Sequence, residues 1–203
     1  MLNKSLLIAV LSLTPLSVTS GPALAQEPPL HIGTLMRQLL DEKSAPAAQQ
    51  PWLEYRSAEG GYRVELPAPP TSQTQHIPLA DGSNARAMMS ESLKGPLAFL
   101  ASHIAYPAGY LHEDRQRVLE SVRNSQLKTR TLVREQRVAV SGVAGLEYVM
   151  AAQGSFTVIR STLVGDRLYQ LVVSGGRDAN VDKDPDVRRF FASFKLASNL
   201  GLP

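Results

Sequence analysis

Cysteine is absent from the 203 residues of the chain. Disulfide bonds, thiolate metal sites and a cysteine nucleophile are therefore excluded, and so is a lipid attached to an N-terminal cysteine. In an oxidising compartment, the stability of such a chain has to come from its hydrophobic core.

A long apolar run is missing as well. The best candidate extends from Leu6 to Val18, which is too short for a bilayer span of ~20 residues. It is followed by Ala23-Leu24-Ala25, the small-x-small pattern that signal peptidase cleaves. We therefore predict a signal peptide at 1–25, cleaved between Ala25 and Gln26, a periplasmic or secreted product, and no transmembrane segment in the mature chain. An uncleaved anchor is the alternative, which this flank disfavours.

An excess of charge of one sign is also lacking. Without residues 1–25 the chain has 20 basic and 18 acidic residues, a net charge of +2. A dedicated nucleic-acid binder would show a clear basic excess on one face. No nucleic-acid partner is expected.

Motifs for catalysis and cofactor binding do not occur either. The histidines form neither H-x-x-x-H nor H-E-x-x-H, so no zinc helix is predicted. The patterns G-x-S-x-G, G-x-x-x-x-G-K-[ST] and G-x-G-x-x-G are missing. We expect no catalytic residues, no cofactor and no metal, and hence no enzyme. The histidines are His31, His76, His103 and His112.

Residues 26–51 are predicted to form a tether. Apolar residues at helical spacing indicate a short amphipathic helix, and "DEKSAPAAQQP" at 41–51 is typical of a linker. The helix either docks on a partner or a membrane surface, or packs on its own domain. The second is favoured, because so short a helix is marginal alone. Its apolar residues are Ile32, Leu35, Met36, Leu39 and Leu40.

The remaining residues, 52–203, predict a single α+β domain. Alternating and β-rich segments separated by turns predict an antiparallel sheet of about seven or eight strands. The stretch 112–127 changes to a helical period and predicts a mid-chain helix, and a second helix is expected near the C-terminus. A domain of ~150 residues can bury a sizeable core. The turns are Gly60-Gly61, Asp81-Gly82, Ser141-Gly142 and Gly165-Asp166.

The Gly165-Asp166 turn fixes the register of one hairpin. With Val164 opposite Arg167, both faces of the hairpin carry apolar residues, which predicts a central position covered on both sides. Gly175-Gly176 is interpreted as the loop that leaves this hairpin. The expected opposed pairs include Ile159 with Val172, Leu163 with Leu168, and Val158 with Val173.

The segment "DKDPDVRRFFASFKL" at 182–196 has two interpretations. Aspartates at alternate positions begin a calcium loop, but Val187 stands where such a loop needs glycine, and Ser193 where it needs glutamate. In the favoured interpretation, Asp184 caps a helix and Pro185 takes its first position. The spacing of four apolar residues supports this helix. They are Val187, Phe190, Phe191 and Phe194, and the aspartates concerned are Asp178, Asp182, Asp184 and Asp186.

A run of five cations is a possible interaction surface. It could face an anionic lipid, a polyanionic envelope polymer or a protein partner, although interleaved acids favour a solvated surface. Four tyrosines either line a small-molecule pocket or pack in the core with the hydroxyl at its rim. The cations are Arg123, Lys128, Arg130, Arg134 and Arg137, and the tyrosines are Tyr106, Tyr110, Tyr148 and Tyr169.

Four pieces of the chain resemble a group of uncharacterised secreted bacterial proteins. They are "GGYRVELPAPP" at 60–70, "YLHEDRQRVLESVR" at 110–123, "LVGDRLYQLVV" at 163–173 and "RRFFASFKL" at 188–196. That group is distantly similar to the PsbP-like fold, the fold of the extrinsic subunit of the oxygen-evolving complex. The resemblance implies an antiparallel sheet with helices on its faces and a role in assembly or interaction without catalysis.

The preferred hypothesis is a non-enzymatic periplasmic or secreted module that binds an envelope protein partner or helps an envelope complex assemble. The alternative is a small-ligand carrier with a pocket between sheet and helix. A hydrolase with an unrecognised site is a third hypothesis, and it requires convergent polar groups with perturbed pKa values in a cleft.

Overall fold

The computed structural model describes residues 51–112 and 114–197. The predicted signal peptide, its cleavage site and the amphipathic segment of the tether fall within residues 1–50 and lie outside the described residues. None of the helices in the described range has the length and apolar character needed to cross a membrane.

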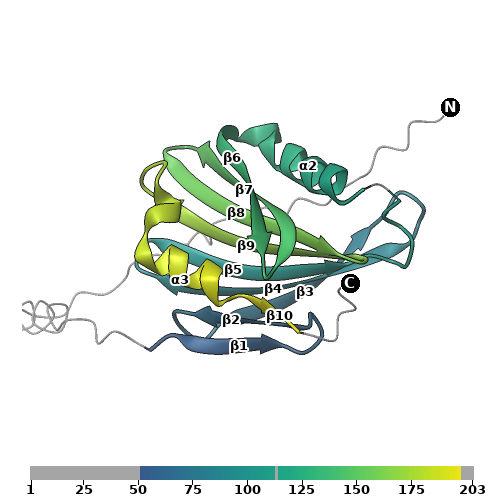
Figure 1. Ribbon diagram of the computed structural model, residues 1–203, viewed down its shortest axis with the longest axis horizontal. Coiled ribbons are helices and arrows are strands. Elements are labelled where there is room, and N and C mark those ends of the chain that lie inside the picture. Colours follow the sequence, from purple (N-terminus) through teal and green to yellow (C-terminus); the bar gives the residue numbers. More distant parts are fainter. Residues whose placement is uncertain (1–50, 113, 198–203) are drawn as a thin grey trace, which may run out of the picture. The chain divides into compact units, whose positions relative to one another are not determined.

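Seven antiparallel strands form the main sheet, in the order β3-β4-β5-β9-β8-β7-β6 (Figure 1). The α+β prediction with a sheet of this size is confirmed. Most strands follow each other as hairpins, because turn residues separate them in the sequence. The strands are β3 (Thr71–Pro78), β4 (Asn84–Lys94), β5 (Leu97–Ala105), β6 (Thr131–Val140), β7 (Val143–Ala152), β8 (Ser155–Val164) and β9 (Arg167–Gly176).

Three short strands form a second sheet, in the order β1-β2-β10. They are β1 (Leu53–Ser57), β2 (Tyr62–Leu66) and β10 (Lys195–Leu196). This sheet adds to the predicted one: β2 pairs with β1 and with β10 from the far end of the chain, and not with a strand of the main sheet. Neither β1 nor β10 has a sequence pattern that predicts a strand on its own.

The β8–β9 hairpin lies in the middle of the main sheet, and its register is the predicted one. Val164 opposes Arg167, as the turn requires. The apolar pairs on both faces are buried, so the prediction of a central, doubly covered hairpin is confirmed. They are Ile159 with Val172, Leu163 with Leu168, and Val158 with Val173.

Gly175 and Gly176 end β9 and do not form a separate loop, so that interpretation is corrected. Gly175 has a φ of 94°, in the left-handed region that favours glycine. A Cβ at this position would clash with the carbonyl oxygen of Pro96. The absence of a side chain therefore lets the β4–β5 turn lie directly against the end of β9.

Helix α2 (Arg115–Gln126) covers one face of the main sheet, where it contacts β7 and β8. Its cap is Asp114, whose carboxylate accepts a hydrogen bond from the Arg117 N–H at 3.1 Å. The helix is therefore shorter than the predicted 112–127, and His112 lies before it. A 3-10 turn, η1 (Leu127–Thr129), joins α2 to β6.

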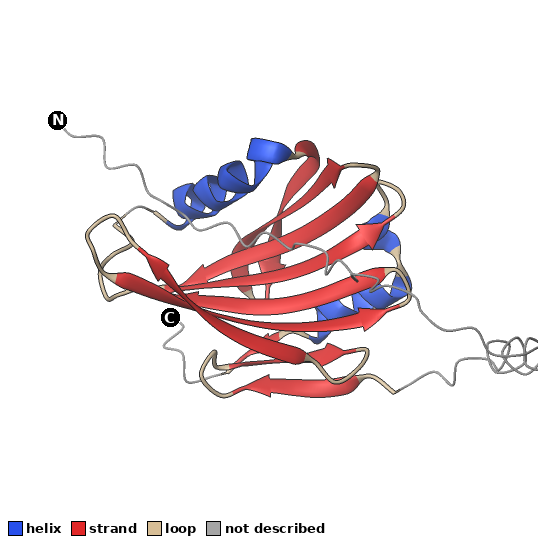
Figure 2. Cartoon of the chain, turned by 180° about the vertical axis from the view of Figure 1, so that it is seen from behind, coloured by secondary structure: helices blue, strands red, loops and turns tan. Residues whose placement is uncertain are grey.

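Helix α3 (Pro185–Ser193) lies on the opposite face, after the 3-10 turn η2 (Val181–Lys183). Figure 2 shows α2 and α3 separated by the main sheet. The small sheet and α3 pack together on the main sheet to form one hydrophobic cluster. Phe194 belongs to this cluster although it lies one residue beyond the helix. The contributing aromatic residues include Tyr62, Phe99, Tyr169, Phe190, Phe191 and Phe194.

Candidate functional site

The predicted cap at the start of α3 is confirmed. The Asp184 carboxylate accepts hydrogen bonds from the N–H groups of Asp186, at 2.8 Å, and of Val187, at 3.4 Å. Pro185 begins the helix, where its missing N–H costs no hydrogen bond. Asp184 therefore stabilises the helix terminus.

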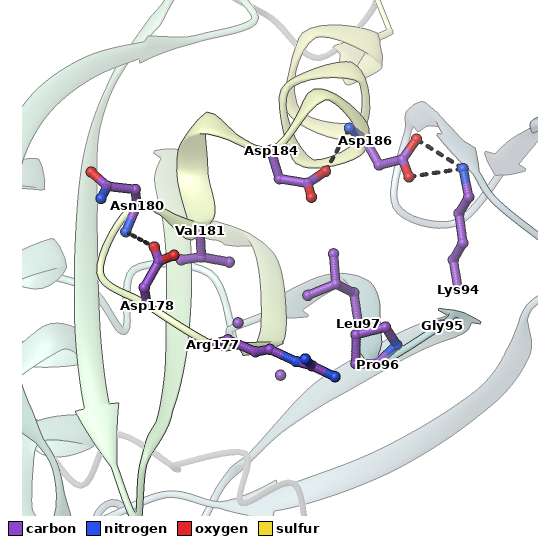
Figure 3. Close-up of a pocket in the computed structure, with 12 residues that line it drawn as sticks. Lys94, Gly95, Pro96, Leu97, Arg177, Asp178, Asn180, Val181, Asp184 and Asp186 are labelled. Atoms are coloured by element: carbon purple, nitrogen blue, oxygen red, sulfur yellow. Dashed lines mark hydrogen bonds and ion pairs between the residues drawn. The ribbon is translucent and has the colours of Figure 1, made fainter.

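The other aspartates of the segment have separate partners. Asp178 accepts a hydrogen bond from the Asn180 N–H at 2.7 Å, and Asp182 forms an ion pair with Arg134. Asp186 binds the Lys94 ammonium at 2.8 Å (Figure 3). Among residues 51–112 and 114–197, no three His, Asp or Glu side chains are grouped so as to hold a metal ion.

A pocket of about 550 Å³ lies between the start of α3, the end of β9 and the β4–β5 turn. Its charges include the paired Lys94 and Asp186, and Arg177. Figure 3 shows the Arg177 side chain extending toward Pro96 and Leu97. The lining has two cations, Lys94 and Arg177, against three carboxylates, and the Lys94–Asp186 pair holds α3 to the β4–β5 turn.

Two members of the basic run hold the fold together. Arg123 on α2 forms an ion pair with Glu135 on β6, so it ties the helix to the edge of the main sheet. Arg134 pairs with Asp182 and also donates a hydrogen bond at 2.8 Å to the carbonyl oxygen of Ala179. These two arginines are therefore structural.

The other three cations of the run have no ion-pair partner in the described part of the chain. Lys128 and Arg130 line a pocket of about 740 Å³ with no acidic residue among its lining residues. We call it the basic pocket; it is formed by residues 127–131 and by the β7–β8 turn at 151–154. Arg137 is exposed further along β6. Of the five cations predicted to form a surface, the structure therefore brings Lys128 and Arg130 together in one pocket.

The basic pocket continues into the first residues of β6, the outermost strand of the main sheet at that edge. Leu132 and Val133 are 37% and 40% exposed, which is high for large apolar side chains. The β6–β7 register shifts between Leu132 and Arg134, so Val133 is the extra residue of a bulge. We call residues 131–137 the β6 edge.

A buried histidine lies where the two sheets meet. His103 on β5 is 1% exposed, and neither ring nitrogen has a hydrogen-bond partner among the described residues. Its ring lies 6.0 Å from that of Tyr62 and 6.4 Å from that of Tyr169. A Cβ at Gly60 would lie 2.6 Å from its Nδ1, so only glycine lets the β1–β2 turn sit this close to the ring.

The surroundings of His103 favour the neutral imidazole. Burial lowers the pKa of His103; Glu59 opposes this effect, while Arg167 and Arg86 add to it. Sequence reasoning placed His103 in a strand but did not identify its burial. The signal that could have revealed this burial is the spacing of two residues from Ala101 and four from Phe99, which places His103 on the same buried face of the strand.

The four tyrosines do not share a site. Tyr148 donates a hydrogen bond to Gln126 of α2 at 2.9 Å, and Tyr169 donates to the Gly60 carbonyl oxygen on the other face at 2.8 Å. Tyr106 and Tyr110 stack on each other, with ring centroids 5.8 Å apart. The hydroxyls of Tyr148 and Tyr169 are bonded inside the protein and not at the rim of the core.

Comparison with known proteins adds a distant structural likeness. No family model and no curated protein matches the sequence. The solution structure of cyanobacterial PsbP (CyanoP) from Synechocystis sp. PCC 6803 is similar, with a TM-score of 0.45 and 13% sequence identity. The match covers 74% of this chain and 95% of that one. The matched structure is a PsbP protein, in keeping with the resemblance expected from the sequence, and nothing further follows from a likeness of this size.

Proposed function

We propose that the chain is exported and acts, without catalysis, as an interaction module for a protein of the cell envelope. The supporting observation is how the basic run divides. Arg123 and Arg134 form ion pairs within the chain, whereas Lys128 and Arg130 line a pocket without acidic residues. Surface cations that stabilise no internal contact are available to steer and hold an oppositely charged partner.

The absence of catalysis in this proposal rests on where the reactive side chains lie. His76 is exposed on β3, His103 is buried between the sheets, and His112 lies before α2. Asp184 and Asp186 bind the α3 terminus and Lys94. An acid–base mechanism needs such groups within hydrogen-bond reach of one substrate atom.

Export is tested by the mass of the product. We expect the full chain, expressed in a bacterial cell, to yield an envelope-fraction protein that begins at Gln26. Replacing Ala25 by tyrosine should block cleavage, because the signal peptidase accepts only small residues there. A Gln26→Ala variant is the control and should be processed normally. An intact, cytoplasmic product from the native chain would contradict the export part of the proposal.

The interaction itself is tested by cross-linking in intact cells. The tagged full chain is treated with an amine-reactive reagent, and adducts are resolved by mass. One dominant adduct with a second envelope protein is the expected result. A chain that stays monomeric at every reagent concentration, while a known envelope complex cross-links in the same cells, would reject an interaction module.

A small-ligand carrier remains the second candidate, because the pocket of about 550 Å³ lies between the main sheet and α3. Such a carrier should gain thermal stability with small metabolites or lipids by mass action. An Arg177→Ala variant should then lose the gain, whereas Arg115→Ala, a change at an exposed position on α2, should keep it.

A further inference from the structure

The charged side chains that line the basic pocket are all positive. Lys128 and Arg130 lie in it, Arg137 follows along β6, and no acidic side chain lines the pocket. The nearest acid on β6, Glu135, is paired with Arg123. An arginine fork binds a carboxylate through two parallel hydrogen bonds, and a lysine beside it adds a second positive charge. The pocket is therefore matched to carboxylate groups.

Next to this pocket, the surface is apolar. Leu132 and Val133 are two of the four large apolar side chains that the described residues expose. The bulge at Val133 changes the direction of its side chain relative to a regular strand. Exposed apolar residues beside a polar rim are a common feature of protein-binding surfaces.

The backbone of β6 supplies a third contact. In the described part of the chain, β6 has a strand on one side only, so its outer side carries N–H and C=O groups that can pair with an added strand. The opposite edge, β3, has the sequence TSQTQHIP and carries no lysine or arginine. Of the two described edges of the main sheet, the β6 edge is the one that combines an open backbone with exposed apolar side chains and cations without an ion-pair partner.

We propose that the β6 edge and the basic pocket bind an extended, acidic segment of a partner protein as an additional β-strand. This inference rests on the proposed function and names the chemistry of the partner. Strand addition gives affinity through main-chain hydrogen bonds, and side-chain contacts give specificity. Apolar residues of the segment contact Leu132 and Val133, and its carboxylates bind Lys128 and Arg130. A lipid surface would satisfy the cations but not the backbone of β6.

The experiment places a photo-reactive phenylalanine analogue at position 132 of the full chain in living cells. The same residue at position 75, on the exposed β3 edge, is the control. We expect a discrete protein adduct from position 132 and none from position 75. In the partner, the linked peptide should carry an Asp or Glu within about three residues, because a strand advances only ~3.3 Å per residue.

A charge reversal separates this proposal from simple proximity. The double variant Lys128→Glu/Arg130→Glu should lower the yield of the position-132 adduct by roughly tenfold or more, since each lost charge pair alone is worth about that factor. Arg115→Glu/Lys195→Glu changes the net charge equally at exposed positions on α2 and on the small sheet and should leave the yield unchanged. Circular dichroism confirms that both variants are folded.

Several outcomes would overturn the inference. An adduct that is insensitive to the charge reversal, a lipid adduct, or a second copy of this chain at position 132 would each reject an acidic partner segment. A protein adduct from position 75 alone would reject the β6 edge but leave the interaction module intact. If neither position 132 nor position 75 cross-links to a protein, both the interaction module and the binding site at the β6 edge are rejected.

Discussion

Between residues 178 and 186, the carboxylates bind partners within the chain, whereas the two cations of the basic pocket have no ion-pair partner among residues 51–112 and 114–197. Both segments lie at the ends of strands of the main sheet, and both looked like candidate sites in the sequence. The acidic segment holds α3, η2 and the β4–β5 turn in place. The comparison shows that a cluster of charges is informative about binding only once its internal partners have been counted.

The difference has a local cause. The acidic segment starts a helix, and the first turn of a helix has unpaired N–H groups that attract carboxylates. The basic pocket follows the last turn of α2, where cations suit the helix dipole but need no specific partner. Asp184 is therefore fixed by two hydrogen bonds, whereas no described residue forms a side-chain hydrogen bond or ion pair with Lys128 or Arg130.

The largest expected effect comes from truncating a buried side chain of α3, the helix that the acidic segment begins. Phe190→Ala should lower the free energy of unfolding by about 3–5 kcal/mol, because it leaves a cavity in the core. Phe190 is fully buried, and its ring lies 5.5 Å from that of Phe99. Urea unfolding followed by the fluorescence of Trp52, the only tryptophan, measures the change.

The control for this variant is Leu93→Ala, since Leu93 is 65% exposed. Its effect should stay within about 0.5 kcal/mol. If Phe190→Ala loses as little as this control, the packing of α3 on the sheet contributes little to stability.

A buried group without a partner should behave differently from the exposed unpaired cations. His103→Leu removes two buried ring nitrogens that have no hydrogen bond, so it should raise the free energy of unfolding by about 1–3 kcal/mol near neutral pH. His76→Leu, at an exposed position on β3, should change it little. If His103→Leu is destabilising by a similar amount, the imidazole is an essential packing element.

The same histidine predicts a pH dependence. Burial lowers the pKa of His103 in the folded chain, so the unfolded chain binds the proton more tightly. Stability is therefore complete above the unfolded pKa of about 6.5 and falls as the pH drops below it. Unfolding measured between pH 7.5 and 5.5 should show this loss in the native chain and not in His103→Leu. If the free energy of unfolding changes equally with pH in both proteins, His103 is not the source of the pH dependence.

A smaller effect is expected at the helix cap. Asp184→Ala should cost about 0.5–2 kcal/mol, because the N–H groups of Asp186 and Val187 lose their acceptor. Asp184→Asn should retain most of the stability, since asparagine is an equally good cap. A variant pair with equal losses would show that the negative charge of Asp184, and not its hydrogen bonds, stabilises α3.

Features that depend on neighbouring residues were predictable from the sequence. The Gly165-Asp166 turn predicts the register of β8 and β9 as far as Thr157 and Ser174, where the register shifts, and the Asp184-Pro185 pair predicts the start of α3. Both follow from backbone rules that act over a few residues. The helix predicted over 112–127 is in the right place, but it begins only at Arg115, because Asp114 is its cap.

Features that depend on distant residues were not predictable. The third strand of the small sheet is an example: Lys195 on β10 lies opposite Arg63 on β2, and nothing in either segment indicates the other. For the same reason, the sequence alone does not distinguish the structural cations of the basic run from the unpaired ones. Only the fold shows that Asp182 comes to lie beside Arg134, which removes that arginine from the candidate surface.

The smallest effect on stability is expected where the proposed binding effect is largest. Lys128→Ala/Arg130→Ala should change the free energy of unfolding by no more than about 0.5 kcal/mol, because neither side chain has a partner to lose in the described part of the chain. Arg134→Ala is the matched variant within the same basic run. It should cost about 1 kcal/mol or more, because Asp182 and the Ala179 carbonyl oxygen lose their donor. If the double variant is the less stable of the two, its cations serve the fold, and the basic pocket is no more a binding site than the aspartates are.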